Sequence, residues 1–156
     1  MRKKKVFWKT SGAKFNVPPS TAEREMEKIR TEYGSLKPEY VIAEASKARH
    51  PLHASFNWDN TDAAHKYRLL QAGDMIRCLA VIITDGKTEH ETRAYLNVKI
   101  ETMEKGYHPT RVVMSDAEGR EYVVRKALKR FQALRTEYNH LKELAGVFRA
   151  LDKVKV

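Results

Sequence analysis

The stretch LAVIITDGKTEHETRAYLNVKI, residues 79–100, decides the fold class of this chain. Its beginning, Leu79–Ile83, is short, apolar and rich in β-branched residues, and Asp85-Gly86 is a pair that favours a turn. Further on, apolar residues alternate with mainly polar ones: Ala94, Leu96, Val98 and Ile100 with Arg93, Tyr95, Asn97 and Lys99. Such alternation is typical of a strand with one buried and one solvated face. We therefore expect one antiparallel β-hairpin here.

Helical patterns account for most of the remaining sequence. Ser20–Glu23 has the spacing of a capping box, so a first helix is expected to start there and to end at Gly34. Pro38 suits the first position of a second helix, and Asn60 or Thr61 suits the N-cap of a third. The expected fold class is therefore α+β, mostly helical, with one hairpin and a long C-terminal helix.

The C-terminal helix carries the strongest periodic signal and is expected to span residues 116–154. Its apolar residues recur at alternating spacings of three and four, the pattern of a coiled-coil seam: Val124, Ala127, Phe131, Leu134, Tyr138, Leu141, Ala145 and Phe148. A second apolar row, which includes Leu128 and Leu144, gives the helix more than one apolar side. We therefore predict a homodimer or higher oligomer that pairs through this seam.

Domain organisation follows from length and charge. The 156 residues suffice for one core, so residues 20–156 are expected to form a single α+β domain, and residues 1–19 a flexible basic arm. The chain has a formal net charge of +10. Six cations lie before the first acid, Glu23: Arg2, Lys3, Lys4, Lys5, Lys9 and Lys14. This balance favours a polyanionic partner.

Other features exclude several classes of protein. Cys78 is the only cysteine, so no intrachain disulfide can form, and a reducing cytoplasm is expected. No apolar run approaches the length of a membrane span, and no catalytic motif is present. His50, His53 and His65 do not have the spacing of a recurrent zinc site. We expect no enzyme activity, no metal, no cofactor and no membrane contact.

Three segments are candidate nucleic-acid contacts. The arm combines its six cations with the indole of Trp8, which could stack on bases. Arg93 and Lys99 lie on the solvated face of the expected hairpin. The C-terminal helix begins with one basic patch: Arg125, Lys126, Lys129 and Arg130. Each segment also has a plainer interpretation, as a solubilising tail, a solvated strand face or a solvated helix face.

Sequence blocks within residues 38–77 carry a family resemblance. They are Pro51-Leu52-His53, the F-x-W-D of Phe56–Asp59, and the A-A-x-x-Y-R-L-x-Q-A of residues 63–72. RAYLNV (93–98), GYHP (106–109) and VFRAL (147–151) fit as well. The chain resembles, over residues 38–151, a group of small uncharacterised proteins encoded by bacteriophages and prophages. The resemblance implies a phage or prophage origin and transfers no activity or site.

Two functions from different classes are compatible with these features. The first is a phage-type DNA-binding or DNA-organising protein that contacts the phosphate backbone through the basic arm and the basic helix patch, with DNA favoured over RNA. It would lie in the host cytoplasm and associate with the nucleoid. The second is an assembly protein that docks on a phage or host protein through the C-terminal helix, with the positive charge serving solubility.

Overall fold

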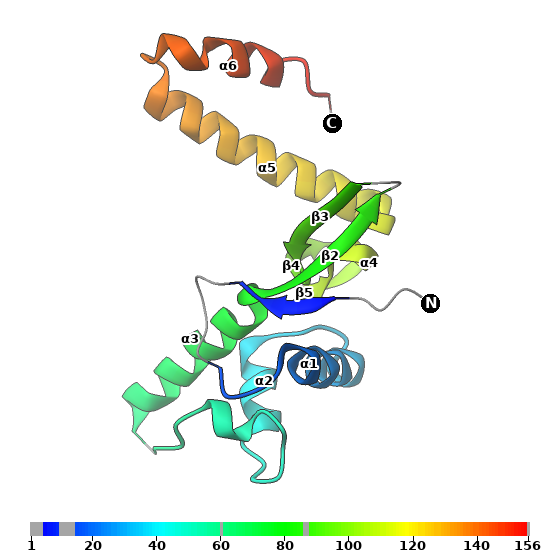
Figure 1. Cartoon of the computed structure of the whole chain (residues 1–156), viewed down its shortest axis with the longest axis vertical. Helices are drawn as coiled ribbons and strands as arrows, with labels where there is room; N and C mark the ends of the chain where they lie inside the picture. The colour runs from blue at the N-terminus through cyan, green and yellow to red at the C-terminus, as the bar shows by residue number, and fades with distance from the viewer. Residues whose placement is uncertain (1–4, 10–14, 60, 86–87, 156) are drawn as a thin grey trace.

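The computed structural model describes residues 5–9, 15–59, 61–85 and 88–155. Figure 1 shows an elongated molecule with helices at both ends and strands between them. One end holds α1 (Pro19–Tyr33), α2 (Pro38–Ala45) and α3 (Asp62–Cys78). At the other end α5 (Ala117–Tyr138) and α6 (Ala145–Leu151) project away from the strands. The α+β class with a long C-terminal helix is confirmed.

Two antiparallel sheets lie in the middle of the molecule, where one hairpin was expected. The first has the order β1 (Val6–Trp8), β2 (Leu79–Asp85), β3 (Thr88–Arg93), and the second pairs β4 (Tyr95–Ile100) with β5 (Met103–Pro109). The expected pairing of β2 with residues 94–100 is therefore wrong. Residues 88–93 fold back on β2 directly, with Asp85 opposite Thr88. Their sequence, TEHETR, is polar and almost fully exposed, so it lacks the alternation that marks a half-buried strand.

Ala94 joins the two sheets. Its N–H donates to the Leu79 carbonyl at 2.9 Å, and its own carbonyl accepts from the Thr110 N–H at 2.9 Å. The chain thus leaves the first sheet after Arg93 and enters the second at Tyr95. Tyr95 is only 2% exposed, so its place on a solvated face was also wrong. Its neighbours in α1 include Glu27 and Arg30, and α1 is an element that the hairpin pattern alone could not place.

The N-terminal segment is partly folded, which corrects the expectation of a flexible arm over residues 1–19. Val6–Trp8 pairs with β2, and the Lys9 N–H donates to the Cys78 carbonyl at 3.0 Å. Trp8 donates from Nε1 to the carbonyl of Val17, which is 6% exposed and belongs to the core. Trp8 also packs on Phe15, so its ring is engaged within the fold. Arg2, Lys3, Lys4 and Lys14 lie outside the described residues.

The end of α1 and the starts of the helices follow the sequence signals, except at the start of α1. The αL conformation of Gly34, with φ of 78°, ends α1, and Pro38 opens α2. Thr61 caps α3 by accepting from the Ala64 N–H, and Asp116 caps α5 by accepting from the Gly119 N–H at 2.7 Å. The capping box predicted at Ser20–Glu23 is not formed, because Pro18 is the N-cap and its carbonyl accepts the first helical bond.

The core joins the first three helices to both sheets. Its fully buried side chains come from α1, α2, α3 and the adjoining strands, and include Met26, Ile29, Val41, Met75, Ile76, Leu79 and Val98. Leu36 exchanges two backbone hydrogen bonds with Tyr107, which attaches β5 to the loop after α1. Gly106 has φ of 152°, and a Cβ there would lie 2.8 Å from the Ser35 hydroxyl. Glycine therefore permits this close approach of β5.

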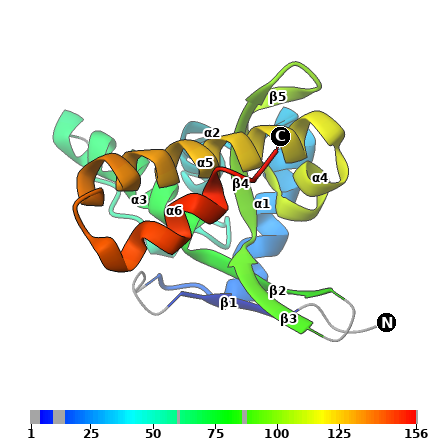
Figure 2. The ribbon, with the colours of Figure 1, turned by 90° about the horizontal axis from the view of Figure 1, so that it is seen from above.

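The C-terminal helix predicted over residues 116–154 is interrupted. After α4 (Thr110–Ser115), α5 ends at Tyr138, a 3-10 turn η2 (Lys142–Leu144) follows, and α6 turns back alongside α5 (Figure 2). Arg135 in α5 bonds to Asp152 at 2.6 Å and lies over the Phe148 ring. Asn139 and His140 are weak helix formers, which favours the break at this position. Within the described residues, no helix combines the length and apolarity needed to cross a membrane.

Candidate nucleic-acid interface

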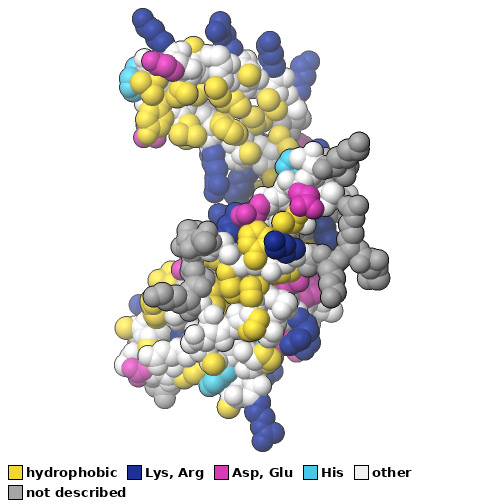
Figure 3. All heavy atoms as spheres, in the orientation of Figure 1, with side chains coloured by type: hydrophobic (Ala, Val, Ile, Leu, Met, Phe, Trp, Pro, Cys, Tyr) yellow, Lys and Arg dark blue, Asp and Glu magenta, His cyan; other side chains and the backbone are white. Residues whose placement is uncertain are grey.

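A groove lies between the strands and α5, and we call it the basic groove. Its volume is about 630 Å³. It is lined by residues from α3, β3, β4, β5 and α5: Arg77, Arg93, Leu96, Asn97, Tyr107, Tyr122, Val123, Lys126, Ala127, Arg130, Phe131 and Leu134. Figure 3 shows Lys and Arg side chains gathered where the projecting helices meet the strands. The long sequence separations mean that only the tertiary fold forms this groove.

The charge of the basic groove is one-sided. Four of its lining residues are cationic, namely Arg77, Arg93, Lys126 and Arg130, and among the described lining residues there is no carboxylate. A second hollow of similar volume, about 640 Å³, lies between α1 and β4. That hollow is lined by three acids and three cations, so its charges balance. The lining charge therefore favours anions in the basic groove more than in the hollow beside α1.

Local structure positions each cation of the basic groove. Arg93 ends β3, where its carbonyl accepts from the Thr110 hydroxyl. Lys126 donates to the Asn97 carbonyl at 3.4 Å, and its ammonium lies 5.6 Å from the centre of the Tyr122 ring. Arg130 lies one helical turn after Lys126, on the same face of α5.

Arg77 is the fourth cation and the only one of the four with an ion pair among the described residues. Its guanidinium pairs with Asp74 and also forms a hydrogen bond with Tyr107. Both contacts raise the pKa of Arg77 above its ordinary value. Arg93, Lys126 and Arg130 keep their charges available to a ligand.

The predicted contact residues separate into two groups. Arg93, Lys126 and Arg130 meet in the basic groove. The others lie elsewhere, and those in the described part are Lys5, Trp8, Lys9, Lys99, Arg125 and Lys129. Lys9 pairs with Glu91 and Arg125 pairs with Glu121. Lys129 and Arg125 line a smaller hollow between α5 and the end of α6.

Sequence reasoning missed Arg77, Tyr107 and Tyr122. Arg77 sits in the last turn of α3, where a cation ordinarily reflects the helix dipole. Tyr107 lies in β5, a strand that was not among the elements predicted from the sequence. Tyr122 lies on α5 two residues before Val124, the first residue of the predicted seam. No local pattern joins these residues, because the contact between α5 and the second sheet brings them together.

The predicted oligomerisation residues remain largely unpacked in this chain. Phe131, Leu134 and Tyr138 on α5 are 44%, 45% and 37% exposed, and Leu141 beyond it is 37% exposed. Val124 and Phe148 are half-buried, and Ala127 is exposed. Leu141 and Phe148 lie after the end of α5, so the seam is not continuous on one helix. Phe131 and Leu134 also line the basic groove, so the two predicted functions share these side chains.

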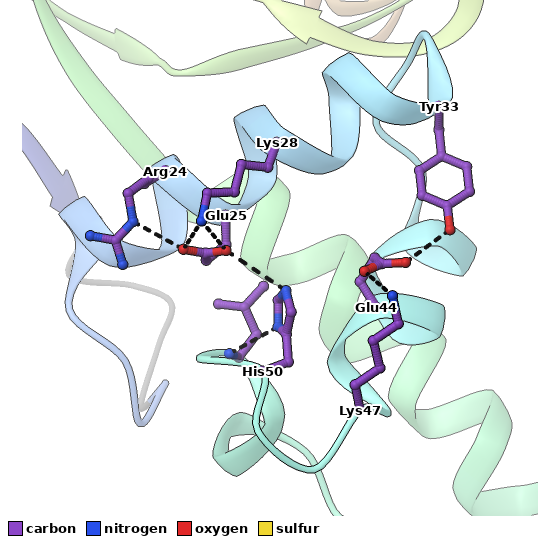
Figure 4. Close-up of polar contacts among 8 residues, drawn as sticks. Arg24, Glu25, Lys28, Tyr33, Glu44, Lys47 and His50 are labelled. Carbon is purple, nitrogen blue, oxygen red and sulfur yellow. Dashed lines mark hydrogen bonds and ion pairs between the residues drawn. The ribbon is translucent and has the colours of Figure 1, made fainter.

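A buried polar cluster lies at the opposite end of the molecule, between α1, α2 and the turn after α2 (Figure 4). Glu25 is 3% exposed and bonds to Arg24 at 2.9 Å and to Lys28 at 3.0 Å. His50 approaches it, with Nε2 3.8 Å from Oε2 of Glu25, and accepts from the Leu52 N–H at Nδ1. These contacts tie the helices to the following loop.

Glu44 forms the second half of the cluster. Its carboxylate accepts from Lys47 at 2.6 Å and from the Tyr33 hydroxyl at 2.9 Å. The bond from Lys47 is the main reason that the pKa of Glu44 is lowered, and Tyr33 adds to it. None of the residues of this cluster lines the basic groove, so we assign the cluster a structural role.

The histidines and the F-x-W-D block are also engaged in packing. His53 bonds to the Ala45 carbonyl through Nδ1 and stacks on Trp58. Arg68 donates to the carbonyls of Asn57 and Asp59 and lies over the Trp58 ring. Across the described ranges, no group of three His, Cys, Asp or Glu side chains is placed to hold a metal ion.

Comparison of the chain with protein-family models, with curated proteins and with solved structures gave no match.

Proposed function

We propose that this protein is a non-enzymatic DNA-binding or DNA-organising protein that contacts phosphates through the basic groove. The observation that carries the proposal is the set of four cations, from α3, β3 and α5, around a groove whose described lining has no carboxylate. Cations held in this way release counterions from a nucleic-acid backbone on binding. The phage or prophage origin implied by residues 38–151 belongs to the same proposal.

The N-terminal cations add to this interface in a limited way. Of the six, Lys5 and Lys9 flank β1, and Lys9 is paired with Glu91. Trp8 is packed on Phe15 and bonded to Val17, so stacking of its ring on bases is not part of the proposal. Arg2, Lys3 and Lys4 keep their proposed role as additional phosphate contacts.

Charge reversal in the groove tests the DNA-binding proposal. Arg93→Glu/Arg130→Glu is expected to weaken binding of a labelled DNA oligonucleotide by tenfold or more, and to lower the slope of log affinity against log salt by about two. Fluorescence anisotropy between about 50 and 200 mM NaCl measures both. Arg49→Glu/Lys66→Glu is the control, since both residues are exposed, lie outside the groove and change the net charge equally. Equal affinities of the two variants, or no binding by the natural chain, contradict the proposal.

A second candidate function is assembly through α5 and α6. Neither helix has a buried residue beyond Gly119, and apolar side chains remain exposed along both: Phe131, Leu134, Tyr138 and Val147. Two helices alone bury little apolar surface, whereas two such pairs together form a four-helix arrangement with a core. We propose a second copy of this chain as the partner; the same face would also fit a phage or host protein.

Light scattering tests the second candidate. The natural chain is expected to have at least twice the 18.1 kDa chain mass at tens of micromolar. Val147→Glu puts a charge on α6 outside the basic groove and is expected to yield monomers with DNA binding per chain intact, whereas Phe131→Glu is expected to impair both. Leu70→Glu, at an exposed position of α3, is the control. A monomeric natural chain, or a Val147→Glu variant of unchanged mass, contradicts pairing through this face.

A further inference from the structure

The walls of the basic groove carry aromatic rings as well as cations. Tyr107 comes from β5, and Tyr122 and Phe131 come from α5, so rings face the groove from both sides. Phe131 is 44% exposed although it is a large apolar side chain. The ammonium of Lys126 lies 5.6 Å from the centre of the Tyr122 ring, which places a charge and a ring at one point of the wall. Phosphate contact alone would not need these rings.

We propose that the basic groove binds unpaired nucleotides of single-stranded DNA. This inference rests on the proposed DNA binding and specifies the ligand. Rings on a cationic surface recognise single strands, because bases stack on the rings while the cations follow the phosphates. A duplex keeps the faces of its bases within the stack and offers only its backbone to such a groove.

The size of the groove agrees with a single strand. Its volume of about 630 Å³ lies within the range of pockets that enclose drug-sized ligands. That range has room for on the order of one or two nucleotides. Lys99, which is exposed on β4 beyond Asn97, would contact the phosphates of the strand outside the groove.

An acidic peptide is the competing ligand for this surface. Its carboxylates would meet Arg93, Lys126 and Arg130 equally well, since these contacts depend on charge. Stacking separates the two ligands, because nucleobases present flat π surfaces and acidic side chains do not. The presence of three rings in the groove therefore favours nucleotides.

Affinity for matched ligands is the first test. Fluorescence anisotropy compares the full chain on a labelled mixed-sequence single strand, on the duplex of the same sequence, and in competition with polyglutamate of equal charge. We expect the single strand to bind at least tenfold more tightly than the duplex and to resist polyglutamate. Equal binding of strand and duplex, or equal displacement by polyglutamate, overturns this inference and leaves DNA binding intact. Absence of any binding overturns both.

Ring removal is the second test. Tyr122→Leu/Phe131→Leu keeps apolar side chains and the net charge while removing two rings. It is expected to weaken single-strand binding at least fivefold and to leave duplex binding and chain mass unchanged, since each stacked base contributes appreciably to affinity. Tyr138→Leu is the control, because Tyr138 is an exposed ring on the same helix but outside the groove. If the variant and the control lose equal affinity for the single strand, the assignment of stacking to the rings of the groove is overturned.

Photocrosslinking locates the base directly. A single strand carrying 5-iododeoxyuridine, irradiated in complex with the full chain, is expected to form adducts at Tyr107, Tyr122 or Phe131, mapped by mass spectrometry. Adducts confined to residues outside the groove would show that the strand follows another surface. They would overturn the stacking inference even if the charge-reversal variant had lost its affinity.

Discussion

Deletion of residues 1–17 is expected to lower the free energy of unfolding by about 4 kcal/mol and the melting temperature by roughly 10 °C. The deletion removes β1, which pairs with β2 from Val6 to Trp8. It also removes Val17 from the core and the Trp8 ring that packs against the core. Burial of one Val side chain contributes about 1.5–3 kcal/mol, and the partly buried indole adds a similar amount. Circular dichroism during heating measures the change.

Deletion of residues 2–4 is the matched control for this truncation. It removes Arg2, Lys3 and Lys4 and leaves β1 in place, so the melting temperature should stay within about 2 °C of the natural value, the usual range for surface changes. DNA affinity should fall modestly, because three phosphate contacts are lost. If the chain lacking residues 1–17 had the same melting temperature as the natural chain, β1 would not contribute to the stability of the fold. The longer deletion alone therefore cannot test the role of the cations, because it also removes part of the core.

Glu25→Gln is expected to lower the free energy of unfolding at pH 7 by about 2 kcal/mol and to flatten its decline in acid. Burial raises the pKa of Glu25, but hydrogen bonds and charges from Arg24 and Lys28 outweigh burial, so the pKa is lowered below 4.5. A lowered carboxyl pKa stabilises the fold above the unfolded pKa, and this stability is lost as the pH falls through the folded value. Arg24 and Lys28 are largely exposed, which keeps the effect moderate.

His50 adds an earlier step to the acid response. Burial lowers the pKa of His50 below 6.5, and the charge of Glu25 partly opposes this shift. Neutral His50 therefore stabilises the fold above pH 6.5, and this contribution is lost as the pH falls through the folded pKa. Urea denaturation from pH 7 to about pH 3 should show a decline in two stages, first from His50 and then from Glu25.

The Glu25→Gln profile distinguishes this explanation from a general charge effect. The variant should show the His50 stage at lower pH, because the opposing charge of Glu25 is gone, and should lose much of the stage below pH 4.5. Glu137→Gln, at an exposed position of α5, changes the net charge equally and should follow the natural profile. Parallel profiles for Glu25→Gln and the natural chain would contradict the role of this cluster.

Local signals in the sequence predicted the elements better than their pairing. The stop at Gly34, the start at Pro38 and the caps at Thr61 and Asp116 were all predictable, because each depends on the backbone preferences of one to four neighbouring residues. The strand at residues 88–93 was missed because an exposed edge strand has no apolar alternation. The break after Tyr138 was missed because the apolar spacing continues across it while the backbone turns.

The candidate site divides in the same way. The basic patch on α5 was visible because residues three and four apart share a helix face. The sequence did not show that the patch splits between two surfaces. Lys126 and Arg130 face the second sheet, whereas Arg125 and Lys129 face the side of α6. Trp8 was predicted as a stacking ring, yet it packs on Phe15, because Val17 and β2 give it partners that the local sequence does not show.

The sequence by itself determined the α+β class, the ends of most helices, the excess of positive charge and the apolar spacing of the C-terminal segment. These properties depend on composition and on residues close in the chain. Only the tertiary structure decided which strands pair, that β1 belongs to a sheet, and that Arg77, Arg93 and Arg130 surround one groove with Tyr107. The physical reason is that the groove is formed by contacts between α3, both sheets and α5. Its lining residues are separated by up to 57 positions, from Arg77 to Leu134, and share no local pattern.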